Sequence, residues 1–142
     1  RRDFLESMIQ IIQRQGRTIL FSSHILSDVD RVADHIGILS EGVLRVDCPT
    51  EHFRESLRKV VVEISEPLKE PPACPGLLSY QSNGERLELV IVNYSAEHRA
   101  YVDSLSPRSV DVIEFNLEDA FVEYTRGRKG ALPVFRREAV HV

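Results

Sequence analysis

The feature that most constrains this chain is an apolar, β-branched run that ends in a histidine and passes directly into an amphipathic helix. The run is Thr18-Ile19-Leu20-Phe21, followed by Ser22-Ser23-His24 and then by apolar residues at helical spacing from Ile25 to Ile36. A short, fully apolar run is typical of a strand buried on both faces of a parallel sheet. We therefore predict a strand over 17–22 that places His24 at its carboxyl end, where open α/β sheets bind ligands.

The residues before this strand predict a helix over 2–15. Its apolar positions fall on one face, and Gly16 is a favourable residue for ending it. A helix, a strand and a second helix in direct succession are typical of a βαβ unit without its first strand, and hence of an α/β fold. Because the chain opens with Arg1 directly inside a helical pattern, we expect it to be part of a longer chain.

Residues 37–57 predict a hairpin followed by a short helix. The strands are expected over 37–40 and 43–46, with the turn at Glu41-Gly42. Pro49 and Thr50 then open a helix that extends to about Leu57.

The second half of the chain predicts a small α+β sheet. Four prolines between residues 66 and 76 exclude a regular helix there, so this link is expected to be an irregular crossover. We predict strands over 60–64, 77–81, 87–92 and 110–115, an Asn83-Gly84 hairpin turn, and helices capped by Ser95 and Asn116. This order resembles a ferredoxin-like unit whose first helix is replaced by the proline-rich link. The predicted divisions are 1–57, 58–126 and a basic, partly mobile tail over 127–142.

Composition excludes several functional classes. The formal net charge of −4 disfavours a dedicated nucleic-acid-binding surface, and no apolar run approaches the roughly 20 residues that span a bilayer. Cys48 and Cys74 are the only cysteines. Cys48 and His52 are four residues apart, but two free thiols are the better interpretation, and we predict no metal site.

The serines beside His24 raise a second interpretation, a serine–histidine nucleophilic pair. Ser22 and Ser23 are adjacent to His24 at a strand end, where neighbouring side chains point in different directions, and no Gly-x-Ser-x-Gly elbow is present. A turn-forming or capping role is favoured for the serines. For His24 itself, the structural alternative is a hydrogen bond to the backbone at the strand–helix corner. The other histidines, His35, His52, His98 and His141, have no comparable setting and are expected on the surface.

Residues 1–57 closely resemble the end of the nucleotide-binding domain of ABC transporters, a P-loop NTPase-type α/β fold. The resemblance rests on the run from Gly16 to Leu26, on Asp34-His35-Ile36-Gly37-Ile38-Leu39, and on the Glu41-Gly42 hairpin. His24 occupies the position of that family's H-loop, or switch, histidine. The resemblance implies that His24 is catalytic and nucleotide-binding: it would contact the γ-phosphate of ATP and help to position the attacking water.

The other motifs of that family are absent from this chain. It contains no Gly-x-x-x-x-Gly-Lys-Ser/Thr phosphate loop, no Leu-Ser-Gly-Gly-Gln signature and no apolar strand ending in Asp-Glu. In the family these motifs precede the H-loop, and Arg1-Arg2-Asp3-Phe4-Leu5 matches the helix that follows them. The resemblance therefore implies a C-terminal fragment that lacks the Walker A, signature and Walker B motifs and is inactive alone, within a parent ATPase that uses ATP and Mg²⁺.

The C-terminal half resembles the small appendage that follows the nucleotide-binding domain in many bacterial ABC exporter-type ATPases. The similarity is carried by Asn116-Leu117-Glu118-Asp119-Ala120-Phe121 and by Tyr124-Thr125. The alternative function is a stand-alone regulatory or protein-interaction module with a ferredoxin-like domain. An RNA-binding domain is disfavoured because the expected central strands carry Glu63 and Glu88 in place of aromatic residues.

The resemblance also implies partners and a location. They are membrane-spanning permease subunits and a second ATP-binding subunit, at the cytoplasmic face of the membrane. From the residues themselves we expect self-association, because the apolar run over 17–22 lacks the neighbouring strands that would cover it. Exchange of the first helix and strand between two chains is one way to cover this apolar run.

Overall fold

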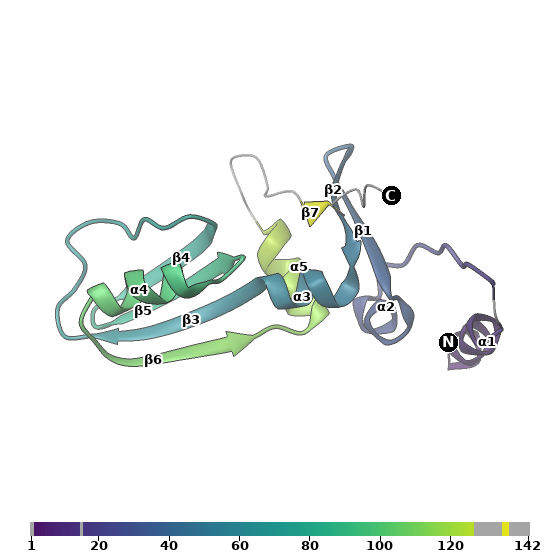
Figure 1. Cartoon of the computed structure of the whole chain (residues 1–142), viewed down its shortest axis with the longest axis horizontal. Helices are drawn as coiled ribbons and strands as arrows, with labels where there is room; N and C mark the ends of the chain where they lie inside the picture. The colour runs from purple at the N-terminus through teal and green to yellow at the C-terminus, as the bar shows by residue number, and fades with distance from the viewer. Residues whose placement is uncertain (1, 15, 127–134, 137–142) are drawn as a thin grey trace.

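A computed structural model describes residues 2–14, 16–126 and 135–136 of the chain. The elements form an elongated row, with the N-terminal helix at one end and a four-stranded sheet at the other (Figure 1). In chain order they are α1 (Arg2–Ile12), α2 (Leu26–Val32), β1 (His35–Ser40), β2 (Val43–Pro49), α3 (Thr50–Ser56), β3 (Leu57–Ile64), β4 (Leu77–Asn83), β5 (Arg86–Val92), α4 (Ala96–Ser104), β6 (Pro107–Glu114), α5 (Leu117–Thr125) and β7 (Phe135–Arg136).

The smaller sheet is built on the predicted hairpin. β1 and β2 pair antiparallel, and β7 adds parallel to β2 through the Val46–Phe135 and Asp47–Arg136 pairs. The turn residues Glu41 and Gly42 have φ values of 53° and 75°. Two positive φ angles are what a two-residue hairpin turn that matches strand twist requires, so the predicted turn is confirmed. Most of the tail over 127–142, which we predicted to be partly mobile, lies outside the described residues.

The larger sheet has the strand order β4-β5-β3-β6, and every neighbouring pair is antiparallel. α4 packs on one face through Val102, over alternate residues of β3 and β5. The covered core comprises Val60, Val62, Ile64, Leu87, Leu89 and Ile91. Residues 65–76, which contain the four prolines, form neither helix nor strand, as predicted.

Gly76 closes the proline-rich crossover by a close backbone approach to β5. Its φ is 74°, and a Cβ atom at this position would lie 2.5 Å from the carbonyl oxygen of Val92. The Val92 N–H donates to the Gly76 carbonyl at 2.8 Å. Any side chain at this position would clash with the Val92 carbonyl. Only glycine therefore allows the crossover to approach β5 this closely.

A second apolar cluster joins the two sheets. It combines residues of the hairpin and α3 with Leu78, Val90 and Val92 of the larger sheet and with the buried face of α5. At its centre the fully buried rings of Phe53 and Tyr124 pack edge-to-face, with centroids 5.5 Å apart and an interplanar angle of 87°. Asn116 caps α5, as predicted, because its Oδ1 accepts from the Asp119 N–H at 2.8 Å.

The predicted strand over 17–22 is wrong for this structure. These residues carry no strand assignment, and Leu20 is 98% exposed. A strand exists only when its N–H and C=O groups pair with a neighbour, and no described segment pairs with this one. Figure 1 shows the segment as an open connection between α1 and α2.

Several element boundaries also differ from those predicted. α1 ends at Ile12 and not at residue 15. α2 ends at Val32 because Ala33 already has extended backbone and β1 begins at His35, three residues after the end of the helix. The second hairpin turn is formed by Gly84 and Glu85, since Asn83 still pairs with Arg86. Among the described residues no helix is both long and apolar enough to cross a membrane.

We expect Phe53→Ala to lower the free energy of unfolding by about 3–5 kcal/mol, because it removes a fully buried ring from the cluster that joins the sheets. Urea denaturation followed by circular dichroism measures this change. The control is Tyr80→Ala on β4, where the ring is 45% exposed and the loss should stay near 1 kcal/mol. Equal losses in the two variants would contradict the central role of this cluster.

Candidate functional site

His24 lies on a bend immediately before α2 and its side chain is exposed. The extended segment before it has no strand partner among the described residues, whereas the helix after it is packed against the protein. Within the described part of the chain its ring makes no hydrogen bond. The alternative in which His24 hydrogen-bonds the backbone at the corner therefore finds no support in the structure.

The neighbouring serine acts locally. Ser23 Oγ accepts from the Ile25 N–H at 3.0 Å, just ahead of the first turn of α2. This is the turn-forming role expected of the serine, because its hydroxyl oxygen accepts a hydrogen bond from the N–H two residues later. Among the described residues no hydrogen bond joins Ser23 to the ring of His24, so the structure gives no support to a serine–histidine nucleophilic pair.

The helix that follows His24 is fixed to α3 by polar contacts at its carboxyl end. Arg54 donates to Asp30 at 2.7 Å, and both side chains are partly buried. Thr50 Oγ1 donates to the Ala33 carbonyl at 2.8 Å, and the Thr50 N–H donates to the Asp34 carbonyl at 3.0 Å. Val29 and Ala33 add apolar contact with the cluster that joins the sheets. These contacts thus hold α2, the helix that follows His24, against the rest of the protein.

The other histidines do not join His24. His35 pairs with Asp47 across the first hairpin, with Nε2 and Oδ1 2.6 Å apart, and both side chains are exposed. His52 is exposed on α3, as predicted, and His141 lies outside the described residues.

The prediction of a surface position for His98 is wrong, because this residue is only 5% exposed. Its Nδ1 accepts from the Ser95 N–H at 3.0 Å, which forms a capping box at the start of α4. Its Nε2 donates to the Pro75 carbonyl at 2.6 Å, and its ring stacks on Tyr94. His98 therefore ties α4 to the proline-rich crossover, a structural role that the Ser95-x-x-His98 spacing could have indicated.

Both cysteines are free thiols, and Cys48 is buried while Cys74 is partly buried. Burial raises the pKa of the Cys48 thiol, and the nearby Asp47 charge raises it further. Burial also raises the pKa of Cys74. Among the described residues no three or more His, Cys, Asp or Glu side chains are grouped to hold a metal ion.

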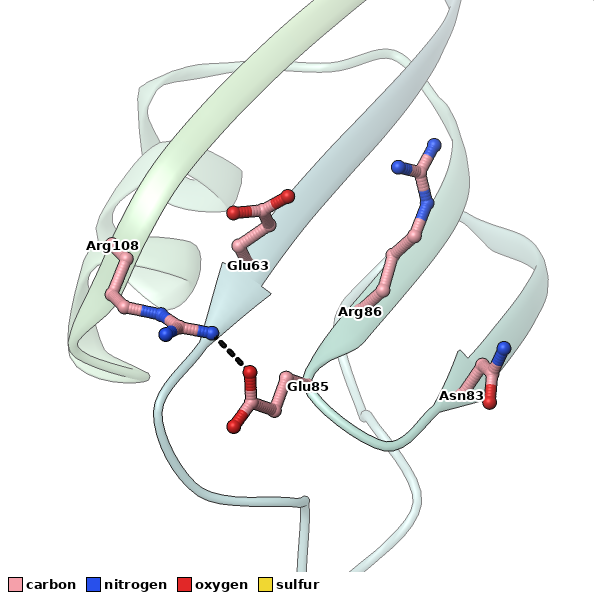
Figure 2. A pocket seen from close by; sticks show the side chains of 5 residues that line it. All are labelled: Glu63, Asn83, Glu85, Arg86 and Arg108. Atoms are coloured by element: carbon pink, nitrogen blue, oxygen red, sulfur yellow. Dashed lines mark hydrogen bonds and ion pairs between the residues drawn. The ribbon is translucent and has the colours of Figure 1, made fainter.

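A shallow pocket of about 260 Å³ lies at the far end of the larger sheet, away from His24. Figure 2 shows Glu63 between Arg108 and Arg86, with Glu85 and Asn83 at the rim. Arg108 pairs with Glu85, and Arg86 pairs with Glu88 at 3.1 Å. The Arg86 hydrogen bond lowers the pKa of Glu88, and the Lys59 charge adds to this effect. Both guanidinium groups are thus already matched by carboxylates.

The chain is similar to several curated transport ATP-binding proteins. It is 45% identical over 49 residues to the bacitracin transport ATP-binding protein BcrA of Bacillus licheniformis, over 34% of this chain and 16% of that protein. It is 30% identical over 130 residues to an uncharacterized ABC transporter ATP-binding protein of Synechocystis, over 87% of this chain and 35% of that protein. No protein-family model and no solved structure matches the chain significantly.

A third match is to the ABC transporter ATP-binding protein YtrB of Bacillus subtilis. It covers a larger part of this chain than the two matches above. It has 21% identity over 129 residues, which is 91% of this chain and 44% of that protein. A match of this extent leaves out only 9% of the chain, so it includes His24 and the whole four-stranded sheet. The chain spans less than half the length of each of these three relatives.

We expect His98→Ala to lower the free energy of unfolding by about 2–3 kcal/mol, because it removes a helix cap and leaves the Pro75 carbonyl without its donor. Urea denaturation measures the loss. His24→Ala is the matched control, and its effect should stay within about 0.5 kcal/mol because that ring is exposed. A large loss in His24→Ala would show that His24 has a structural role.

Proposed function

The chain is related over most of its length to the ATP-binding proteins of ABC transporters, and we propose that it is the C-terminal portion of such a subunit. In the intact protein this subunit couples ATP hydrolysis to transport across a membrane. The observation that carries the proposal is the similarity over 87% and 91% of the chain, which includes both the His24 region and the second half. The resemblance in the His24 motif and hairpin agrees with this similarity.

We assign His24 the role of the switch histidine. Its support is its position on an exposed bend ahead of a firmly packed helix, where an imidazole is free to reach a phosphate group bound elsewhere. Phosphoryl transfer depends on well-placed donors around the spreading negative charge of the transition state, which one imidazole can supply. The phosphate loop, the signature sequence and the carboxylate that activates water are absent from this chain, so His24 alone does not form a catalytic site.

ATP and Mg²⁺ belong to the complete site. We propose that the partners are membrane-spanning permease subunits and a second ATP-binding subunit, which would place the protein at the cytoplasmic face of the membrane.

We propose that residues 58–126 are a ferredoxin-like accessory domain that follows the nucleotide-binding part over 1–57. The support is the strand order. β3 and β4 are parallel with β5 between them, and β5 and β6 are parallel with β3 between them. These are two interleaved split βαβ units, of which one has α4 as its connection and the other has the proline-rich crossover.

Two preparations test the catalytic proposal. The chain alone is expected to show no ATPase activity, whereas the chain expressed with the coding sequence upstream of Arg1 should hydrolyse ATP. In that longer protein His24→Ala should lower kcat roughly a hundredfold, because it removes a positioned donor from the transition state. A phosphate-release assay measures both rates.

His52→Ala is the matched control in the longer protein, since His52 is also an exposed histidine. Its kcat should change less than about twofold. Full activity in His24→Ala would remove His24 from catalysis, and ATPase activity in the chain alone would overturn the fragment proposal.

Self-association through the open segment before His24 is a further expectation. The 98% exposed Leu20 and its apolar neighbours can be covered by a second chain. The mass from light scattering should rise with protein concentration, and Leu20→Asp should reduce that rise. Leu39→Asp at the tip of the first hairpin, where the side chain is also exposed, should not. A mass that stays monomeric at all concentrations would count against this expectation.

A further inference from the structure

The helix that follows His24 depends on contacts outside itself. α2 has seven residues, and none of those seven is buried. A helix this short is marginal in isolation, because most helical stability in proteins comes from packing against other elements. Within α2, Asp30 accepts from Arg54 of α3 at 2.7 Å, and both side chains are partly buried. The order of α2 is therefore sensitive to whatever holds Arg54 in place.

Arg54 lies in the last turn of α3, which is also only seven residues long. This helix passes directly into the larger sheet, since Ser56 ends α3 and Leu57 begins β3. Figure 1 shows α3 between β3 and α2. The last carbonyl groups of a helix have no partner within it and need donors from elsewhere. The source of those donors decides how firmly the last turn of α3 is held.

Arg58, the second residue of β3, donates to several of these carbonyl groups. Its Nη1 lies 2.6 Å from the carbonyl oxygen of Glu55, 2.8 Å from that of Leu57 and 3.4 Å from that of Arg54. A guanidinium group is also favoured by the negative end of the helix dipole. The Arg58 side chain is 18% exposed, and its Nη2 lies 3.8 Å from Glu114 at the end of β6. Arg58 thus ties the end of α3 to β3 and β6.

A further donor comes from the end of β5. The N–H of Asn93, directly after that strand, donates to the Ser56 carbonyl at 2.6 Å. Asn93 has a φ of 56°, a left-handed conformation that asparagine adopts more readily than most residues. Residues from β3, from β6 and from the segment after β5 therefore converge on the end of α3.

We propose that the larger sheet controls the order of the helix that follows His24, and that Arg58 is the positioning residue through which it does so. A displacement of the sheet that withdraws Arg58 leaves the carbonyl groups without their donor, so the last turn of α3 frays and Arg54 releases Asp30. α2 then loses a contact that supports it. The inference rests on the proposed function for its consequence, which is that the sheet regulates ATP hydrolysis through His24 without contacting the nucleotide.

Hydrogen–deuterium exchange of the full chain tests this control without ATP. Arg58→Ala should raise the exchange rate of the α2 amides about tenfold, because a helix opens more easily once hydrogen bonds that support it are lost. The amides of α4 should keep their rates, since α4 packs on its own apolar cluster with β3 and β5. An equal rise in α2 and α4 would show general destabilisation and overturn the proposal. So would α2 amides that are unprotected in the unaltered chain.

Two further variants test the route. Arg86→Ala is the matched control, because Arg86 is also an arginine of the larger sheet but pairs with Glu88. It should leave exchange in α2 unchanged. In an Asp30→Ala background, Arg58→Ala should raise α2 exchange by less than about twofold, because the pair through which it acts is already lost. A full tenfold rise in that background, or an equal effect of Arg86→Ala, would overturn the proposal.

The regulatory consequence is tested in the longer protein that includes the sequence upstream of Arg1. Arg58→Ala should lower kcat about three- to tenfold there, whereas Arg86→Ala should change it by less than about twofold. An unchanged kcat in Arg58→Ala would overturn the regulatory consequence. A longer protein without any ATPase activity would instead overturn the proposed function, and the exchange measurement would still decide whether the sheet controls α2.

Discussion

The edge-to-face packing of Phe53 on Tyr124 is the contact on which the rest of the arrangement depends. Phe53 comes from the short helix after the first hairpin, and Tyr124 from the last helix of the chain. Around them the hairpin, the end of β5 and α5 bury a common set of apolar side chains. The two sheets therefore share one apolar core, because the last helix packs against the first hairpin.

The local features were predictable from the sequence because their causes are local. The Glu41-Gly42 turn, the Asn116 cap and the proline-rich crossover each follow from the backbone preferences of a few adjacent residues. The predicted strand over 17–22 was wrong because strand formation depends on a pairing partner, which the apolar pattern alone does not reveal. Burial of His98 likewise depends on the Pro75 carbonyl, which is distant in sequence. For the candidate site, the sequence indicated His24 and the helix that follows it. It did not indicate that the segment before His24 lacks a strand partner among the described residues.

The surroundings of His24 are unequal on its two sides. After it, α2 is held by the Asp30–Arg54 pair and by the contacts of Thr50 with Ala33 and Asp34. Before it, residues 17–22 form neither helix nor strand, and Leu20 is 98% exposed. His24 therefore lies between a segment without regular structure and a helix that packs against the rest of the protein.

The return of α5 to the first hairpin also bears on how the protein acquires its fold during synthesis. The apolar faces of β1, β2 and α3 emerge from the ribosome well before Leu117, Ala120 and Tyr124, which cover them. Contacts between segments so distant in sequence form slowly, and apolar surface left open in the meantime promotes aggregation. The four-stranded sheet has the same delay, because β3 receives its second neighbour, β6, only after residues 107–114 have been synthesised. The apolar face of the N-terminal hairpin is thus completed only when Leu117–Thr125 has been synthesised and has packed against it.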